Sequence, residues 1–169
     1  MNDIVRPARL ADSQAMYAIK IAAHAGDLYL SLIPYAYLDK FLEHYTQSRE
    51  REGRFYAKLE KMLNDKSTYV YIIERAGQVG GYMMARQNVS KTKWHLDSLF
   101  VDPVLQGGGL GSQLLGYFLA QIESPCELLV INSNKAAIRL YEKYGFKVVD
   151  HEAGFYYGAA LVKMERLLT

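Results

Sequence analysis

Residues 99–112 read LFVDPVLQGGGLGS and contain the most informative feature of the sequence, a glycine-rich loop. The apolar start of this stretch is typical of a strand, which Asp102-Pro103 ends because proline has no N–H to give to a neighbouring strand. The glycine-rich loop follows, and apolar residues then recur at helical spacing from Leu110 to Ile122. Glycines between a strand end and a helix start let backbone N–H groups turn inward and hold a phosphate at the positive end of the helix. The stretch therefore predicts an anion-binding loop between a strand and a helix.

Two familiar nucleotide-binding loops do not fit this glycine cluster. The mononucleotide P-loop needs Lys-Ser or Lys-Thr after its last glycine, whereas Gly111 is followed by Ser112-Gln113. The dinucleotide fingerprint needs a third glycine three residues after its second, and Ser112 or Leu114 stands there in the two frames. What the loop does match is the pattern Gln-x-x-Gly-x-Gly, beginning at Gln106.

A second motif lies further along the chain, where residues 134–146 read NKAAIRLYEKYGF. This motif, the loop and the strand and turn at 99–103 together resemble the GNAT superfamily of acyl-CoA-dependent N-acetyltransferases. The two motifs stand in the family's order, with a helix and a strand between them. The resemblance runs from about Thr68 to Met164, and the preceding residues fit the family's layout without a recognisable signature.

The remaining patterns predict a mixed α/β fold. Helical spacing begins after Asp12 or Ser13 and returns at residues 37–45, 55–63 and 134–144. Strand patterns occupy residues 4–8, 68–73, 79–86, 93–101, 126–131, 147–149 and 160–166. We expect one domain over residues 1–169, with a mixed, mostly antiparallel central sheet flanked by helices. The resemblance implies that the central strands, at 99–101 and 128–131, splay apart.

Composition narrows the classes of function. Of the 169 residues, 20 are Lys or Arg and 18 are Asp or Glu, a formal charge of +2 that disfavours general nucleic-acid binding. No uncharged apolar run approaches the ~18 residues of a membrane span, so we expect a cytoplasmic protein without a membrane partner. The single cysteine, Cys126, cannot form an internal disulfide, and no metal site is expected. His24, His44 and His151 lack ligand partners at metal-site spacing, which favours surface or structural roles.

The resemblance implies acetyl-CoA as co-substrate. Its pyrophosphate would lie on backbone N–H groups of the loop, and its pantetheine arm along the strand edge, as another strand would. The N–H of Phe100 or Val101 could also stabilise the developing oxyanion of the thioester. The implied CoA-binding residues are Leu99, Phe100, Val101, Gln106, Gly107, Gly108, Gly109, Leu110, Gly111, Ser112, Asn134, Ala137 and Tyr141.

Three residues are candidates for proton transfer. The resemblance places the Tyr141 hydroxyl near the sulfur of CoA, where a phenol can protonate the departing thiolate. Asp97 falls where some family members carry a catalytic glutamate, and it is the leading candidate for the base that deprotonates the amine. Strand alternation puts His95, Asp97 and Leu99 on one face, which makes His95 a second candidate. A water chain without a dedicated base is the alternative.

In the family's layout the first two helices and the loop between the last two strands cover the acceptor. This implies Asp27, Tyr29, Tyr35 and Tyr37 at one end and Tyr156 and Tyr157 at the other. We expect acetyl transfer to a primary amine, on a small molecule or a peptide, by direct attack in a ternary complex. The alternative is a non-catalytic acyl-CoA-binding or sensing module. A homodimer is also considered, because residues 160–166 are predicted to form an edge strand.

Overall fold

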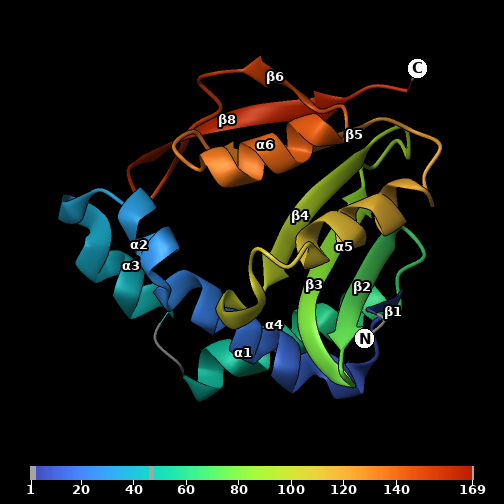
Figure 1. The fold of residues 1–169 in the computed structure, drawn as a ribbon, viewed down its shortest axis with the longest axis horizontal. Coiled ribbons are helices and arrows are strands. Elements are labelled where there is room, and N and C mark those ends of the chain that lie inside the picture. The colour runs from blue at the N-terminus through green and yellow to red at the C-terminus, as the bar shows by residue number, and fades with distance from the viewer. Residues whose placement is uncertain (1–2, 46–47, 169) are drawn as a thin grey trace.

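The computed structural model describes residues 3–45 and 48–168. Within them the strands form one sheet in the order β1-β2-β3-β4-β5-β8-β6, and β7 pairs with β8 (Figure 1). The neighbouring strands are antiparallel except β4 and β5, which are parallel, so the predicted mixed and mostly antiparallel sheet is confirmed. The strands are β1 (Ile4–Pro7), β2 (Thr68–Arg75), β3 (Gln78–Gln87), β4 (Trp94–Val101), β5 (Cys126–Ile131), β6 (Lys147–Asp150), β7 (Phe155–Tyr156) and β8 (Ala159–Arg166).

Helices cover both faces of the sheet. The α-helices are α1 (Ser13–Ala25), α2 (Asp27–Leu32), α3 (Leu38–Tyr45), α4 (Arg49–Leu63), α5 (Leu110–Leu119) and α6 (Lys135–Lys143). Short 3-10 turns occupy Leu10–Asp12, Tyr35–Tyr37 and Pro103–Leu105. Alternation along β2 separates two cores: Ile73 packs with α5 on one face, and Ile72 packs with α1 and α4 on the other. No helix in the described part of the chain has the length and apolar character needed to cross a membrane.

The central strands diverge, as the resemblance implied. β4 and β5 pair only at Trp94 with Cys126 and at His95 with Glu127. Beyond that point no strand in the described part of the chain pairs with the β4 edge that faces β5, and Figure 1 shows β4 diverging from the half of the molecule that carries α6 and β8. This opening lies between the sheet half that carries β1 to β4 and the half that carries β5, β8 and β6.

A bulge in β4 corrects one prediction. Met84 of β3 pairs with Ser98 and Ala85 pairs with Leu96, so Asp97 is an extra residue between two paired positions. The extra residue shifts the alternation, and Leu96 and Leu99 both pack in the core beside α5. The prediction that Leu99 shares a face with His95 and Asp97 is therefore wrong.

The position of the last long strand corrects another prediction. β8 lies between β5 and β6 and pairs with both, so it is not an edge strand. The sheet order puts β1 and β6 at the edges instead. The argument for a homodimer from an exposed edge at residues 160–166 therefore fails, because the ladder groups of that strand are already paired.

Candidate active site

A cleft of about 570 Å³ opens where β4 and β5 diverge. Side chains and backbone from α1, α2, β4, β5 and α6 line it, so segments far apart in the sequence meet there. Most of the site residues predicted from the sequence come together in this one place. Those that line the cleft are Asp27, Tyr29, His95, Asp97, Leu99, Phe100, Val101, Gln106, Asn134, Ala137, Tyr141 and Tyr156.

The glycine loop continues directly from Gln106 at the edge of the cleft. Gly107 and Gly109 have φ of 80° and 82°, a left-handed backbone that a side chain would strain. Gly109 caps α5, whose first amide groups, beginning at Leu110, have no helical carbonyl to bond. The Leu110 side chain is buried in the core, so only its backbone is available to a ligand. Residues 107–112 do not line the cleft itself, and the N–H of Gly108 already donates to the carbonyl of Leu105 at 3.3 Å.

An ion pair from outside the predicted site supports the loop. Arg75 donates to the carbonyl of Gly108 at 3.1 Å and to the carboxylate of Asp3 at 2.7 Å. Gln113, on α5, donates to the same carboxylate at 2.8 Å. The hydrogen bond from Arg75, followed by that from Gln113, lowers the pKa of Asp3 to about 2. Ser112 is also held, because its hydroxyl lies 2.9 Å from that of Tyr144.

Tyr141 enters the cleft from α6. Asn134 begins this helix by accepting a hydrogen bond from the N–H of Ala137 at 3.1 Å, the arrangement expected of an N-cap. Burial raises the pKa of the Tyr141 phenol, so the group carries its proton at neutral pH. Its ring packs against that of Phe146, with centroids 5.8 Å apart. A protonated donor is therefore available in the cleft.

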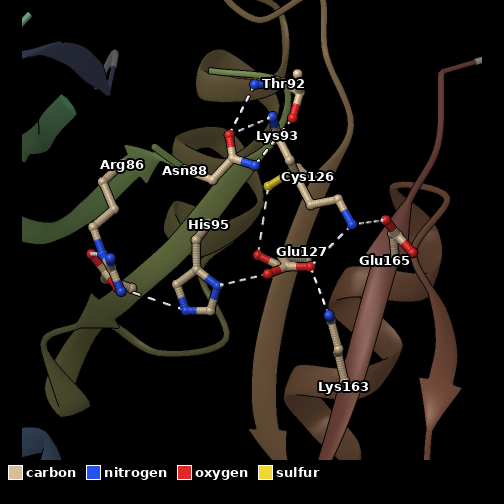
Figure 2. Close-up of polar contacts among 10 residues, drawn as sticks. Arg86, Asn88, Thr92, Lys93, His95, Cys126, Glu127, Lys163 and Glu165 are labelled. Carbon is tan, nitrogen blue, oxygen red and sulfur yellow. Dashed lines mark hydrogen bonds and ion pairs between the residues drawn. The ribbon is translucent and has the colours of Figure 1, made fainter. Parts of the chain in front are cut away.

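The two candidate bases belong to one charged network. Asp97 accepts from Nε of Arg86, and its Oδ1 lies 3.7 Å from Nε2 of His95. Nδ1 of His95 lies 3.6 Å from Oε1 of Glu127, which the sequence did not single out. Figure 2 shows Glu127 between His95 and two lysines, with its carboxylate 3.2 Å from Lys93 and 2.8 Å from Lys163. Burial raises the pKa of Glu127, and the hydrogen bonds from Lys163 and Lys93 lower it further than burial raises it.

Most of the sequence matches one protein-family model. The family model described as "Acetyltransferase (GNAT) domain" matches residues 41–168. This chain belongs to the GNAT acetyltransferase family. The matched residues include β4, the glycine loop and α6, whereas α1 and α2 lie before the match begins.

Individual relatives agree with this GNAT assignment. Mycothiol acetyltransferase of Streptomyces coelicolor is 32% identical over 91 residues, which are 52% of this chain and 29% of that protein. Peptidyl-lysine N-acetyltransferase YjaB of Escherichia coli is 30% identical over 90 residues, 53% of this chain and 56% of that protein. The matched segments thus span less than two thirds of each of these curated relatives.

Solved structures share the fold over nearly the whole chain. PaiA N-acetyltransferase from Thermoplasma acidophilum, in complex with coenzyme A, aligns with a TM-score of 0.79 and 16% identity over 99% of this chain and 100% of that one. YncA from Salmonella typhimurium, with its cofactor acetyl-CoA, aligns with a TM-score of 0.70 and 22% identity over 100% and 95%. At these identities the likeness concerns the GNAT fold.

An aromatic cluster closes the other end of the GNAT cleft. His24 is 2% exposed and stacks on Tyr45, with ring centroids 3.8 Å apart, so it is not a surface residue. Tyr29 and Phe100 lie 4.6 and 4.9 Å from the imidazole centroid. Burial lowers the pKa of His24 to about 4, and Nδ1–H donates to the carbonyl of Lys20 at 2.7 Å. The imidazole is therefore neutral at pH 7. Sequence spacing alone could not reveal this cluster.

Some predicted acceptor residues lie elsewhere. Tyr35 is 92% exposed and does not line the cleft. Tyr37 packs against Gly158 and does not line the cleft.

Cys126 is buried outside the cleft lining, and burial raises the pKa of its thiol to about 12. Within the described ranges, no three or more His, Cys, Asp or Glu side chains group as a metal site.

Proposed function

We propose that this chain transfers an acetyl group from acetyl-CoA to a primary amine, by direct attack in a ternary complex. The observation that carries the proposal is the cleft itself, in which an open strand edge, a buried phenol and two candidate bases converge. Family membership supports an acetyltransferase, and the geometry supports specific roles for individual residues. We further propose that residues 1–169 act as one domain, since both cores pack on one sheet. The cytoplasm is proposed as its location on the sequence grounds alone.

The residues present fit a CoA molecule. The pyrophosphate would accept hydrogen bonds from backbone N–H groups of the loop at residues 107–112, apart from that of Gly108, which already bonds the carbonyl of Leu105. Left-handed glycines and the free first turn of α5 supply these donors. The amide-rich pantetheine arm would pair with the open edge of β4 at Leu99, Phe100 and Val101, as an added strand would. The co-substrate supplies an acetyl thioester, and the chain supplies its orientation.

Proton transfers follow from the same geometry. The phenol of Tyr141 holds its proton in a buried position and would donate it to the departing sulfur. An acceptor amine bound as an ammonium must lose a proton before its nitrogen can attack. Asp97 or His95 would accept that proton, and the neighbouring Glu127 would keep the imidazole in position.

Direct attack is favoured over an acyl-enzyme. The only thiol, Cys126, is buried, outside the cleft lining, and remains protonated because burial raises its pKa to about 12. A thiolate is the nucleophilic form of cysteine, so this residue is poorly suited to carry an acetyl group. The amine and the thioester would therefore occupy the cleft together.

The deciding experiment measures thiol release from acetyl-CoA across a panel of primary amines, with CoA binding measured by calorimetry on the same preparation. Amine-dependent release is the expected result. CoA binding without release from any amine would favour an acyl-CoA-sensing module. Absence of CoA binding would contradict the proposal altogether.

A further inference from the structure

A second cavity, of about 330 Å³, lies between α1, α3 and α4. Figure 1 shows α1 and α4 side by side on one side of the sheet, with the end of α3 next to them. No acidic side chain is among the described residues that line this cavity. The lining consists of Tyr17, Lys20, Ile21, His44, Tyr45, Arg51, Arg54, Phe55 and Lys58.

Two of the cations in this cavity, Lys20 and Lys58, have no carboxylate partner among the described residues, although Lys20 lies over the rings of Tyr45 and Phe55. Burial, followed by the charge of Lys58, lowers the pKa of Lys20, so the two ammonium groups repel each other. Arg54 pairs with Glu50 at 2.7 Å, but their side chains are 70% and 79% exposed and water screens the pair.

The pKa of His44 is affected by the same positive charges. Partial burial lowers its pKa, and the charges of Arg51, Lys20 and Arg54 lower it further. Those cations come from two different helices, α1 and α4, and face the end of α3. A pocket with this charge arrangement favours an anion, because an anion relieves the repulsion between the cations.

Tyr17 provides an independent indication that this cavity is a binding site. The residue is 3% exposed, and its hydroxyl has no hydrogen-bond partner within the described part of the chain. A buried hydroxyl without a partner costs free energy that an acceptor oxygen in the cavity would recover. Carboxylate and phosphate oxygens are such acceptors. The hydroxyl and the cations therefore favour the same class of ligand.

The cavity adjoins the cleft, because Lys20 and Tyr45 line both. We infer that the second cavity binds an anionic group, a carboxylate or phosphate, carried by the amine that the cleft acetylates. This inference rests on the proposed function and narrows the acceptor to amines that bear an anion. Polyamines fit poorly, because their second ammonium would meet Lys20, Arg54 and Lys58.

Lys58 is the best position for a test, since it lines the second cavity and not the cleft. The substrates are ω-amino acids of increasing chain length, ω-aminoalkyl phosphates, and the uncharged amide and the diamine of each length. Wild-type protein should prefer the anionic forms. Lys58→Glu should raise KM for them about tenfold, with kcat and the KM for acetyl-CoA unchanged. The KM for the amides should not change.

Lys61→Glu is the matched control, because Lys61 is exposed on the same helix and lines neither cavity. It makes the same charge change and should leave every KM unchanged. Tyr17→Phe should raise KM for the anionic amines without lowering the melting temperature, a result that a merely structural tyrosine would not give. Equal kcat/KM for acid and amide in wild type, or equal effects of the two lysine variants, would overturn the inference.

A binding measurement separates this inference from the proposed function. Inorganic phosphate, titrated with detection by amide chemical shifts, should perturb residues of α1 and α4 in wild type and not in Lys58→Glu. Failure of acetyl transfer to every amine would remove the proposed function while the phosphate result still tests the cavity. Phosphate binding together with acetylation indifferent to the anion would indicate a free-anion site and overturn the substrate assignment.

Discussion

Arg86 donates from its Nε to both carboxylate oxygens of Asp97, at 2.9 and 3.1 Å. These hydrogen bonds occupy lone pairs that a base would offer to a proton, and the other neighbour of the carboxylate is His95. We therefore expect Asp97 and His95 to act on one proton-transfer path, in which each residue works only when the other is present. We expect Asp97→Asn and His95→Gln each to lower kcat by about 10²-fold. Because both act on one proton path, the double variant should be little slower than the slower single variant.

Steady-state kinetics on wild type, the two single variants and the double variant measure whether the two effects on kcat are coupled. Lys91→Gln, an exposed substitution in the turn before β4, serves as the control and should match wild type. Multiplicative effects of the two substitutions would indicate independent roles. Wild-type turnover in both single variants would indicate that a water chain removes the proton.

Tyr141→Phe removes a hydroxyl and keeps the ring that packs against Phe146. Since the phenol is buried and protonated, its loss should lower kcat by about 10²-fold through slower departure of the thiolate. The dissociation constant for CoA, measured by calorimetry, should stay the same. Tyr117→Phe, on α5 outside the cleft, controls for loss of a tyrosine hydroxyl. Turnover equal to wild type would exclude Tyr141 as the acid.

Gly109→Asp places a side chain and a negative charge where α5 begins, in the loop that should hold pyrophosphate. We expect a loss of CoA affinity of at least about 100-fold, measured by calorimetry. Gly154→Asp is the control, because Gly154 also has a positive φ with open space around it but lies between β6 and β7. Unchanged affinity in Gly109→Asp would mean that the phosphates bind elsewhere.

The sequence predicted those strands and helices whose apolar spacing and capping residues lie within the element itself. Residues 126–131 were predicted as a strand from their apolar run, and β5 has those bounds. The N-cap at Asn134 and a left-handed Gly145 bracket α6 where helical spacing predicted it. These features depend on neighbours in the chain, so the sequence contains the information needed to place them.

Long-range pairings were outside what the sequence could predict. The bulge at Asp97 arises from register with β3, and the interior place of β8 from the order of the whole sheet. The support of the glycine loop joins Asp3 to Arg75 across 72 positions, and neither residue belongs to a motif. Glu127 and His24 were missed for the same reason, since each takes its role from neighbours on other elements.

The stacked pair His24 and Tyr45 predicts how stability depends on pH. Burial lowers the pKa of His24 to about 4, whereas an unfolded chain has the ordinary value of 6.5. Between these values the unfolded state binds a proton that the folded state does not, so stability falls as the pH drops. Relative to pH 7, the loss from this group reaches about 3 kcal/mol at pH 4.

His24→Phe keeps an aromatic ring against Tyr45 and removes the titrating group. Urea unfolding at pH 7 and pH 4 should therefore show that the variant loses about 3 kcal/mol less than wild type over this range. The acidic groups titrate in both proteins and cancel in the comparison. His151→Gln removes an exposed histidine and should follow the wild-type curve. Parallel curves for wild type and His24→Phe would mean that His24 gains its proton as readily in the folded protein as in the unfolded chain, which contradicts a buried neutral imidazole.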